Sequence, residues 1–323
     1  MANQQTCNNI IHVCSVIIRM NGFELHSLAY VFKGGATMAE MDSLHHVTIP
    51  NGETLTYRKR TGGDDVIVLI HGNMTSSKHW DLLMEALHER YTIYAIDLRG
   101  FGGSTYNERI TSIRDFSEDV KAVIDHLQLK HFTVVGWSTG GNVAMQLCAD
   151  YPNLAKKLVL FASGSTRGFP FHNPFQQRVK TLQEIEQDIM KTIPMQMMYD
   201  GQNREGLRLV WNSSIYTHKQ PESERYERYI DDMLTQRNLA DVYHALNQFN
   251  ISDVLDGTNG VANIQIPTLI LYGDRDLVVT KKMTDEIIED FDGRATVVEF
   301  ENCGHSPLVD CLDDVVEHIE QFA

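Results

Sequence analysis

The sequence predicts an α/β protein with a mostly parallel, doubly wound sheet and an inserted helical segment. Short apolar runs rich in β-branched residues alternate with stretches of helical periodicity. Such runs suit strands that are buried on both faces, and helices connect parallel strands. Residues 165–262 interrupt the alternation, because they have helical periodicity and no evident strand. A chain of 323 residues is long enough for one large domain that carries such an insertion.

The chain before the insertion is expected to supply most of the sheet, so residues 43–164 form the first part of the core. A Pro-Asn-Gly turn at 50–52 separates two short strand patterns, which predicts a leading hairpin. Strand and helix patterns then alternate up to residue 161. The expected strands are 46–49, 54–60, 66–70, 91–96, 132–135 and 157–161, and the expected helices are 80–87, 112–127 and one that follows residue 141.

The insertion is expected to be helical, and residues 263–323 complete the core after it. Three apolar helical faces are expected within the insertion. They are formed by Leu182, Ile185, Ile189 and Ile193; by Tyr226, Tyr229, Ile230 and Met233; and by Leu239, Val242, Tyr243, Leu246 and Phe249. The later pattern predicts strands at 266–272 and 296–300, and helices at 283–291 and 308–322.

Residues 1–42 stand apart from this pattern and are expected to be an N-terminal extension without a catalytic part. Their apolar run at 10–18 is far too short to span a bilayer. No Lys or Arg precedes that run, so the positive segment of a signal peptide is missing. Met38 and Met41 could serve as alternative starts. We expect a cytoplasmic protein, with export through the extension as the alternative.

The charge and the cysteines limit the partners. Against 28 Lys and Arg stand 43 Asp and Glu, and the net charge of −15 disfavours nucleic acid and anionic membranes. Five scattered cysteines form no disulfide framework and suit a reducing compartment. Cys303 and Cys311 lie near His305, but no second cysteine–histidine cluster completes a metal site. We expect a small-molecule substrate and neither a metal nor a cofactor, and the oligomeric state stays open.

The most informative motif lies between residues 131 and 141. An apolar strand pattern ends in Gly-Trp-Ser-Thr-Gly at 136–140, and a helical face follows. A G-x-S-x-G sequence between a strand and a helix is typical of a nucleophile elbow, a turn tight enough to strain the serine backbone. Gly136 and Gly140 leave room where side chains would collide. Ser138 is therefore the candidate nucleophile, near the positive end of the next helix.

Two further motifs follow strand patterns, H-G-N-M at 71–74 and D-L-R-G-F-G-G-S at 97–104. Active sites of such sheets gather at the carboxyl ends of the strands, so these motifs are expected near Ser138. Taken in this order, the motifs resemble those of the α/β-hydrolase fold, and the resemblance covers residues 43–323. It implies that residues 165–262 are a helical cap over the serine. It also implies that Asp97 and Arg99 support a loop and do not react.

A serine hydroxyl is a poor nucleophile and needs a base, which an acid must hold in the correct tautomer. The late part of the chain supplies both, because G-D-R-D at 273–276 and N-C-G-H-S-P at 302–307 follow two strand patterns. This is the chain order Ser…Asp…His. His305 is the candidate base. Asp276 matches the position of the acid in the family, and Asp274 is the alternative.

The resemblance also implies where the oxyanion and the substrate bind. The backbone N–H groups of Thr139 and Asn73 would stabilise the oxyanion, with Met74 as the second choice for the latter. The histidines at 46, 71, 79, 172 and 244 are expected to be ordinary, since no motif surrounds them. The candidate substrate-binding side chains are Trp137, Met74, Phe169, Phe171 and Met197.

The reaction favoured by these residues is hydrolysis of carboxylic esters with short to medium acyl chains, through an acyl-enzyme. A dehalogenase or epoxide hydrolase of this fold would be expected to place aspartate at the elbow. The elbow is also similar to that of intracellular polyhydroxyalkanoate depolymerases, and capped relatives include acyl-homoserine lactonases, so both activities stay open. A function of another class is a small-ligand receptor, since plant hormone receptors of this fold keep the triad.

Overall fold

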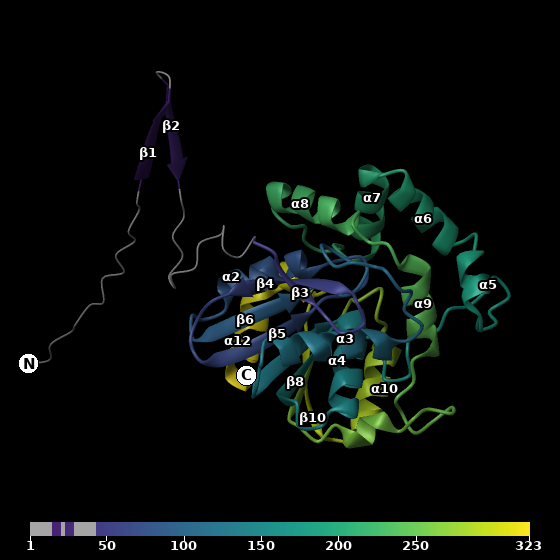
Figure 1. Ribbon diagram of the computed structural model, residues 1–323. Helices are drawn as coiled ribbons and strands as arrows, with labels where there is room; N and C mark the ends of the chain where they lie inside the picture. The colour runs from purple at the N-terminus through teal and green to yellow at the C-terminus, as the bar shows by residue number, and fades with distance from the viewer. Residues whose placement is uncertain (1–14, 21–22, 29–42) are drawn as a thin grey trace, which may run out of the picture.

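The computed structural model describes residues 15–20, 23–28 and 43–323, and an eight-stranded sheet forms its centre (Figure 1). The strand order is β10-β9-β8-β7-β5-β6-β4-β3. Neighbours from β10 to β6 pair in parallel, whereas β4 pairs antiparallel with β6 and β3. The predicted mostly parallel sheet is confirmed. The strands are β3 (His45–Thr48), β4 (Thr54–Arg60), β5 (Asp65–Ile70), β6 (Tyr91–Ile96), β7 (Phe132–Trp137), β8 (Ala155–Phe161), β9 (Thr268–Gly273) and β10 (Ala295–Phe300).

The leading hairpin is confirmed, because β3 and β4 pair across the turn at 50–52. Two earlier strands, β1 (Ser15–Met20) and β2 (Phe23–Leu28), pair with each other in a separate two-stranded sheet. The predictions for residues 1–42 as an extension concern positions that fall largely outside the described residues. Within the described residues, no helix has the length and apolar character needed to cross a membrane.

Helices cover both faces of the sheet. Alternate side chains of a strand point to opposite faces, and here both sets are apolar and must be buried. In β5, Val68 and Ile70 face one apolar cluster, whereas Ile67 and Leu69 face another. Side chains of α3 (Ile113–His126), α4 (Thr139–Asp150) and α10 (Lys281–Phe291) pack into the first cluster. The second contains side chains from η1 (Ser77–Trp80), α2 (Asp81–Ala86) and α12 (Leu312–Phe322). The short α11 (Pro307–Asp310) precedes α12.

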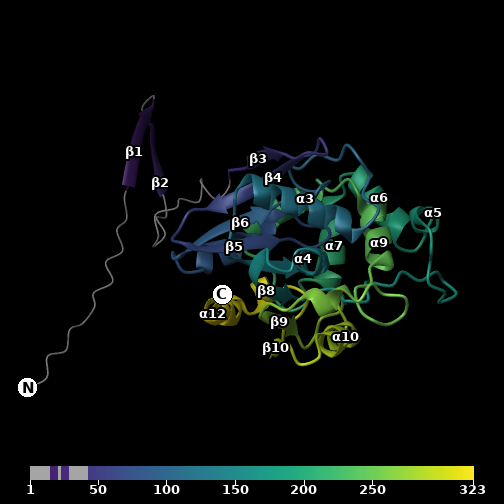
Figure 2. The ribbon, with the colours of Figure 1, turned by 60° about the horizontal axis from the view of Figure 1, so that its bottom comes forward.

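Between β8 and β9 the chain forms five α-helices, which lie along the upper right of the molecule in Figure 1; in Figure 2, α5, α6 and α9 lie at its right. The expected faces at 226–233 and 239–249 are helical and mostly buried. The helices are α5 (Leu182–Glu186), α6 (Thr192–Asp200), α7 (Arg204–Ser214), α8 (Ser223–Met233) and α9 (Leu239–Gln248), and a single 3₁₀ turn, η2 (Gly260–Asn263), follows them.

The expected single helical face over 182–193 is wrong. Helix α5 ends at Glu186, and Ile189 is 70% exposed. The Asp188 side chain accepts a hydrogen bond from the backbone N–H of Lys191 at 2.6 Å, which ends one turn and starts another. Pro194 lies in the first turn of α6, where its missing N–H costs nothing. The apolar periodicity therefore continues through the sequence, although the helix is interrupted between Glu186 and Thr192.

Candidate active site

The candidate nucleophile lies on a strained turn between β7 and α4. Ser138 has φ 54° and ψ −120°, a backbone conformation that a residue with a side chain rarely adopts. Its neighbours in the turn are buried, whereas Ser138 is partly exposed. The strained elbow predicted from the glycine-flanked serine is confirmed. The turn therefore presents a hydroxyl above the strand end.

Close backbone packing explains the two glycines of the elbow. A Cβ on Gly140 would lie 2.1 Å from the carbonyl oxygen of Ile70, and a Cβ on Gly136 would lie 2.3 Å from that of Gly140. Both distances are far below van der Waals contact, so only glycine fits. A Cβ on Gly72 would lie 3.1 Å from Cβ of Ser138. The loop after β5 thus lies directly against the candidate nucleophile.

His305 and Asp276 form a buried pair. His305 Nδ1 lies 2.7 Å from Asp276 Oδ2, and their side chains are 4% and 3% exposed. The other carboxylate oxygen of Asp276 accepts hydrogen bonds from the backbone N–H groups of Val278 and Val279, at 2.8 and 2.9 Å. The carboxylate is therefore fixed in orientation, and it leaves Nε2 of His305 as the nitrogen available to a substrate or a hydroxyl.

The competing acid, Asp274, has a different partner. Its Oδ1 accepts a hydrogen bond from the backbone N–H of Cys303 at 2.9 Å, and the guanidinium of Arg275 lies 3.7 Å from its Oδ2. Asp274 thus holds the turn that follows β10, and Asp276 is the acid placed against His305. The sequence motif favoured Asp276 and kept Asp274 as the alternative, and the contact with His305 agrees with the first choice.

Trp137 joins the elbow to the histidine loop. Its indole Nε1 donates a hydrogen bond to the carbonyl oxygen of His305 at 2.9 Å, and the two rings lie 5.9 Å apart. Because Trp137 directly precedes Ser138, this bond links the turn of the candidate nucleophile to the loop of the candidate base. The side chain is 2% exposed and also packs edge-on against Trp80.

The two candidate oxyanion donors belong to the elbow and to the loop after β5, since Thr139 follows Ser138 and Asn73 follows Gly72, which lies against Ser138. Thr139 is the first residue of α4, so its backbone N–H has no partner within the helix. The side chain of Asn73 is held by Gln236, whose Nε2 donates to Asn73 Oδ1 at 2.8 Å. Gln236 is 6% exposed and comes from the loop between α8 and α9. Sequence analysis missed this residue, because no motif surrounds it.

Asp97 and Arg99 have the structural roles that the resemblance implied. Asp97 accepts hydrogen bonds from the backbone N–H of Ser77 at 2.7 Å and from the Thr56 hydroxyl. Arg99 forms a buried bidentate pair with Asp119, at 2.6 and 2.7 Å. These contacts fix the loops around the strand ends.

His71 is fully buried and has backbone partners on both ring nitrogens. Its Nε2 accepts a hydrogen bond from the backbone N–H of Leu98 at 3.0 Å, and Nδ1 lies 2.7 Å from the carbonyl oxygen of Gly72. Burial lowers the pKa of His71, so the ring is neutral and holds its loop in place.

A second histidine–carboxylate pair joins the inserted helices to the core, and sequence analysis treated this histidine as ordinary. His79 Nδ1 lies 3.2 Å from Asp232 Oδ2, and its ring stacks on Tyr229 at 4.2 Å. Ser76 donates a hydrogen bond to the same carboxylate at 2.6 Å. Burial alone would raise the pKa of Asp232, but the contacts with His79 and Ser76 outweigh it and hold this pKa below its ordinary value.

The side chains expected to bind substrate lie in unlike environments. Phe171 is 4% exposed and packs with Val179 and Ile185, whereas Met197 is 68% exposed. Phe169 and Met74 are partly buried against the two main apolar clusters. Contact between these side chains, or Trp137, and a substrate stays a prediction.

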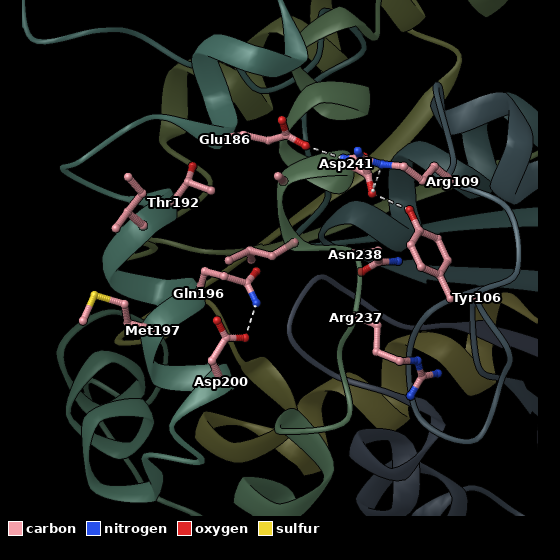
Figure 3. Close-up of a pocket in the computed structure, with 13 residues that line it drawn as sticks. Tyr106, Arg109, Glu186, Thr192, Gln196, Met197, Asp200, Arg237, Asn238 and Asp241 are labelled. Atoms are coloured by element: carbon pink, nitrogen blue, oxygen red, sulfur yellow. Dashed lines mark hydrogen bonds and ion pairs between the residues drawn. The ribbon is translucent and has the colours of Figure 1, made fainter.

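Met197 borders a pocket of about 470 Å³ between α6, the start of α9 and residues 106–109 (Figure 3). Its walls carry an ion-pair network, in which Arg109 contacts Asp241 at 2.7 Å and Glu186 at 2.6 Å. None of Ser138, Asp276 and His305 lines this pocket. The residues that line this pocket are therefore different from the candidate catalytic residues. Among the described residues, no group of three or more His, Cys, Asp or Glu side chains could hold a metal ion.

Comparisons with known proteins place the fold among hydrolases. The chain is similar to the pimeloyl-(acyl-carrier protein) methyl ester esterase of Nitrosomonas europaea, with 25% identity over 255 residues that cover 77% of this chain and 92% of the relative. It is also similar to the cis-3-alkyl-4-alkyloxetan-2-one decarboxylase of Shewanella oneidensis, with 26% identity over 298 residues that cover 86% and 87% of the two chains. A solved esterase from Exiguobacterium antarcticum superposes with a TM-score of 0.69 at 17% identity, covering 86% of this chain and 98% of that one.

The relatives named above differ in their reactions, so at this identity they establish the fold and not the substrate. A family model settles the membership. The model described as the alpha/beta hydrolase fold matches residues 65–310, which is well over half of the chain and contains the elbow, both acids and the histidine. The chain therefore belongs to the α/β-hydrolase fold family.

Proposed function

We propose that this protein is a serine hydrolase that cleaves carboxylic esters, with Ser138 as nucleophile, His305 as base and Asp276 as the acid. The observation that carries the proposal is the 2.7 Å contact between His305 and Asp276 on a loop bonded to the strained elbow of Ser138. A base oriented by an acid, together with a partly exposed serine on the adjoining turn, is the arrangement that activates a hydroxyl. The esterase activity of the Nitrosomonas europaea relative supports the same assignment.

The reaction proceeds in two half-reactions. Nε2 of His305 removes the proton of Ser138 Oγ as the oxygen attacks the ester carbonyl, and the imidazolium that forms is stabilised by Asp276. The same proton then passes to the departing alkoxide, which leaves an acyl group on Ser138. Water attacks this acyl-enzyme with His305 again as base, so the acid is released and the serine is regenerated.

The backbone N–H groups of Thr139 and Asn73 are the proposed donors to the oxyanion of both tetrahedral intermediates. Each such donor typically contributes about 3 kcal/mol to the transition state. The hydrogen bond from Gln236 to the Asn73 side chain supports this role, because it restrains the loop that carries the second donor. We keep Met74 as the second choice for that donor.

The inserted segment, 165–262, is proposed to act as a cap that encloses a short to medium acyl chain. Support comes from its contacts with the loops at the strand ends, through Gln236 to Asn73 and through Asp232 to Ser76. Within this proposal, Phe169, Phe171 and Met197 belong to the cap, and Trp137 and Met74 to the floor beneath it. A cytoplasmic location is part of the same proposal.

The test is a hydrolysis screen that compares the protein with its Ser138→Ala variant. The panel contains p-nitrophenyl esters from acetate to palmitate, free methyl esters, acyl-homoserine lactones, hydroxyalkanoate oligomers and a β-lactone. We expect multiple turnovers on simple esters, no turnover in the variant, and labelling of Ser138 by a phosphonylating reagent. Substantial activity in the variant would overturn the mechanism. One slow turnover that ends in a stable acyl adduct would instead indicate a receptor.

A further inference from the structure

Two free cysteines face each other beside the histidine loop. Sγ of Cys303 lies 3.3 Å from Sγ of Cys311, and neither is in a disulfide. The sequence places Cys303 two residues before His305 and Cys311 six residues after it. The nine-residue segment 303–311 therefore brings its two ends together with His305 inside the loop.

Hydrogen bonds within the segment hold the sulfurs in place. The backbone N–H of Gly304 donates to Asp310 Oδ2 at 2.8 Å, and that of Cys311 donates to the carbonyl oxygen of Pro307 at 2.9 Å. The helix that sequence analysis expected over 308–322 is broken at Cys311, which has φ −147° and ψ 51°. This break directs the Cys311 side chain back to Cys303. A bond between the two sulfurs would therefore require little further ordering of the chain.

We propose that Cys303 and Cys311 form a reversible intramolecular disulfide, with a hydroperoxide as oxidant, that closes the loop around His305. The hydroperoxide first transfers one oxygen to Cys311, which becomes a sulfenic acid as ROOH becomes ROH. The Cys303 thiol then attacks that sulfur, the S–S bond forms, and the hydroxyl leaves with the thiol proton as water. In sum, two thiols and one hydroperoxide give one disulfide, one alcohol and one water.

The order of the two steps follows from exposure. Cys303 is fully buried, whereas Cys311 is partly exposed and meets the oxidant first. The hydrogen bond with Cys311 and burial raise the pKa of the Cys303 thiol, so this sulfur stays protonated until its partner is oxidised. Cys148 lies apart from this pair in α4, where burial raises the pKa of its thiol to about 12.

The disulfide would act on the proposed reaction through His305. Bond formation shortens the sulfur–sulfur distance from 3.3 Å to about 2.05 Å, so the two side chains and the loop between them must together move by roughly 1 Å. His305 is tied to Asp276 and Trp137 on its other side. Misplacement of a reacting group by about 1 Å can cost about a hundredfold in rate, and we expect turnover to fall about tenfold or more. This effect rests on the proposed function, whereas formation of the bond does not.

The chemical test is mass spectrometry of the full chain after treatment with hydrogen peroxide. The tryptic peptide 295–323 contains both cysteines and no Lys or Arg, so both sulfurs are read in one fragment. We expect the mass of this peptide to fall by two hydrogen atoms and its cysteines to resist alkylation. Dithiothreitol should restore the original mass and both alkylatable thiols. In the Cys303→Ser variant, Cys311 should remain a sulfenic acid that dimedone traps. Two alkylatable thiols in the wild-type peptide, at a dose that gives the dimedone adduct in the variant, would overturn the proposal.

The functional test compares wild-type protein with the Cys311→Ser variant before and after the same treatment. We expect peroxide to lower ester hydrolysis about tenfold or more in the wild type, reversibly, and to leave the variant unchanged. A disulfide that forms without any change in turnover would overturn the effect on His305. Should the untreated protein hydrolyse no ester, the proposed function fails while the mass measurement still decides the disulfide.

Discussion

Replacing Asp276 by Asn should disable the base without disturbing the fold. Oδ1 of Asp276 accepts two backbone N–H groups, from Val278 and Val279, and an amide oxygen can take over only that position. The new NH₂ group must then face Nδ1 of His305, 2.7 Å from the oxygen it replaces. As an amide donor it forces Nδ1 to be the acceptor, so the ring proton moves to Nε2, which can no longer take the proton of Ser138.

The size of the effect follows from this geometry. The pair is almost completely buried, so no water can substitute for the lost carboxylate. A wrong tautomer in a triad of this kind typically lowers kcat by about ten-thousandfold, or about 5 kcal/mol of activation free energy. Asp274→Asn is the matched control. Its amide oxygen can still accept from Cys303, and the lost ion pair with Arg275 is solvent-exposed, so we expect a loss of less than about tenfold.

The assay measures kcat on p-nitrophenyl butyrate for both variants, with circular dichroism melts to show that each is folded. Equal losses in the two variants, or a larger loss for Asp274→Asn, would show that the acid has been assigned wrongly. A folded Asp276→Asn variant with near wild-type kcat would refute the reasoning from the fixed carboxylate orientation.

Three further outcomes are expected. Because the folded-state pKa of Asp232 is lowered, its stabilising contribution is complete above its unfolded pKa of about 4 and is lost as the pH falls through the lower folded value. The difference in unfolding free energy between wild type and Asp232→Asn, measured in urea, should therefore shrink progressively as the pH falls below about 4, and a constant difference down to pH 2 would argue against this. A chain that begins at Met41 should keep its melting temperature and activity, since the eight-stranded sheet starts at His45, and loss of soluble protein would count against it. If the insertion encloses the acyl chain, kcat/KM for p-nitrophenyl esters should rise a few-fold per methylene, at about 0.8 kcal/mol each, and fall beyond medium chains; a flat profile would contradict that.

Much of the fold and the strained turn that carries the candidate nucleophile could be predicted from the sequence alone. Buried strands and amphipathic helices leave local periodic patterns, because burial of one face dictates residue type at each step. The conformation of the elbow could be predicted because the contacts that determine it are local. Gly136 and Gly140 are required by backbone contacts within a few residues of Ser138 or on the adjacent strand, so the motif itself carries the geometry.

Only the tertiary structure decided the partners that come from distant segments. It gave Asp276, which the sequence had only favoured over Asp274, its contact with His305, and it brought Gln236 to Asn73 across 163 positions of sequence. Helices α5 and α6 are separate although the apolar periodicity runs through both, because the Asp188 side chain accepts a hydrogen bond from the backbone N–H of Lys191 and interrupts the helix. Contacts of this kind depend on where whole elements pack, and the energy that selects them is shared among many residues, so no local pattern records them.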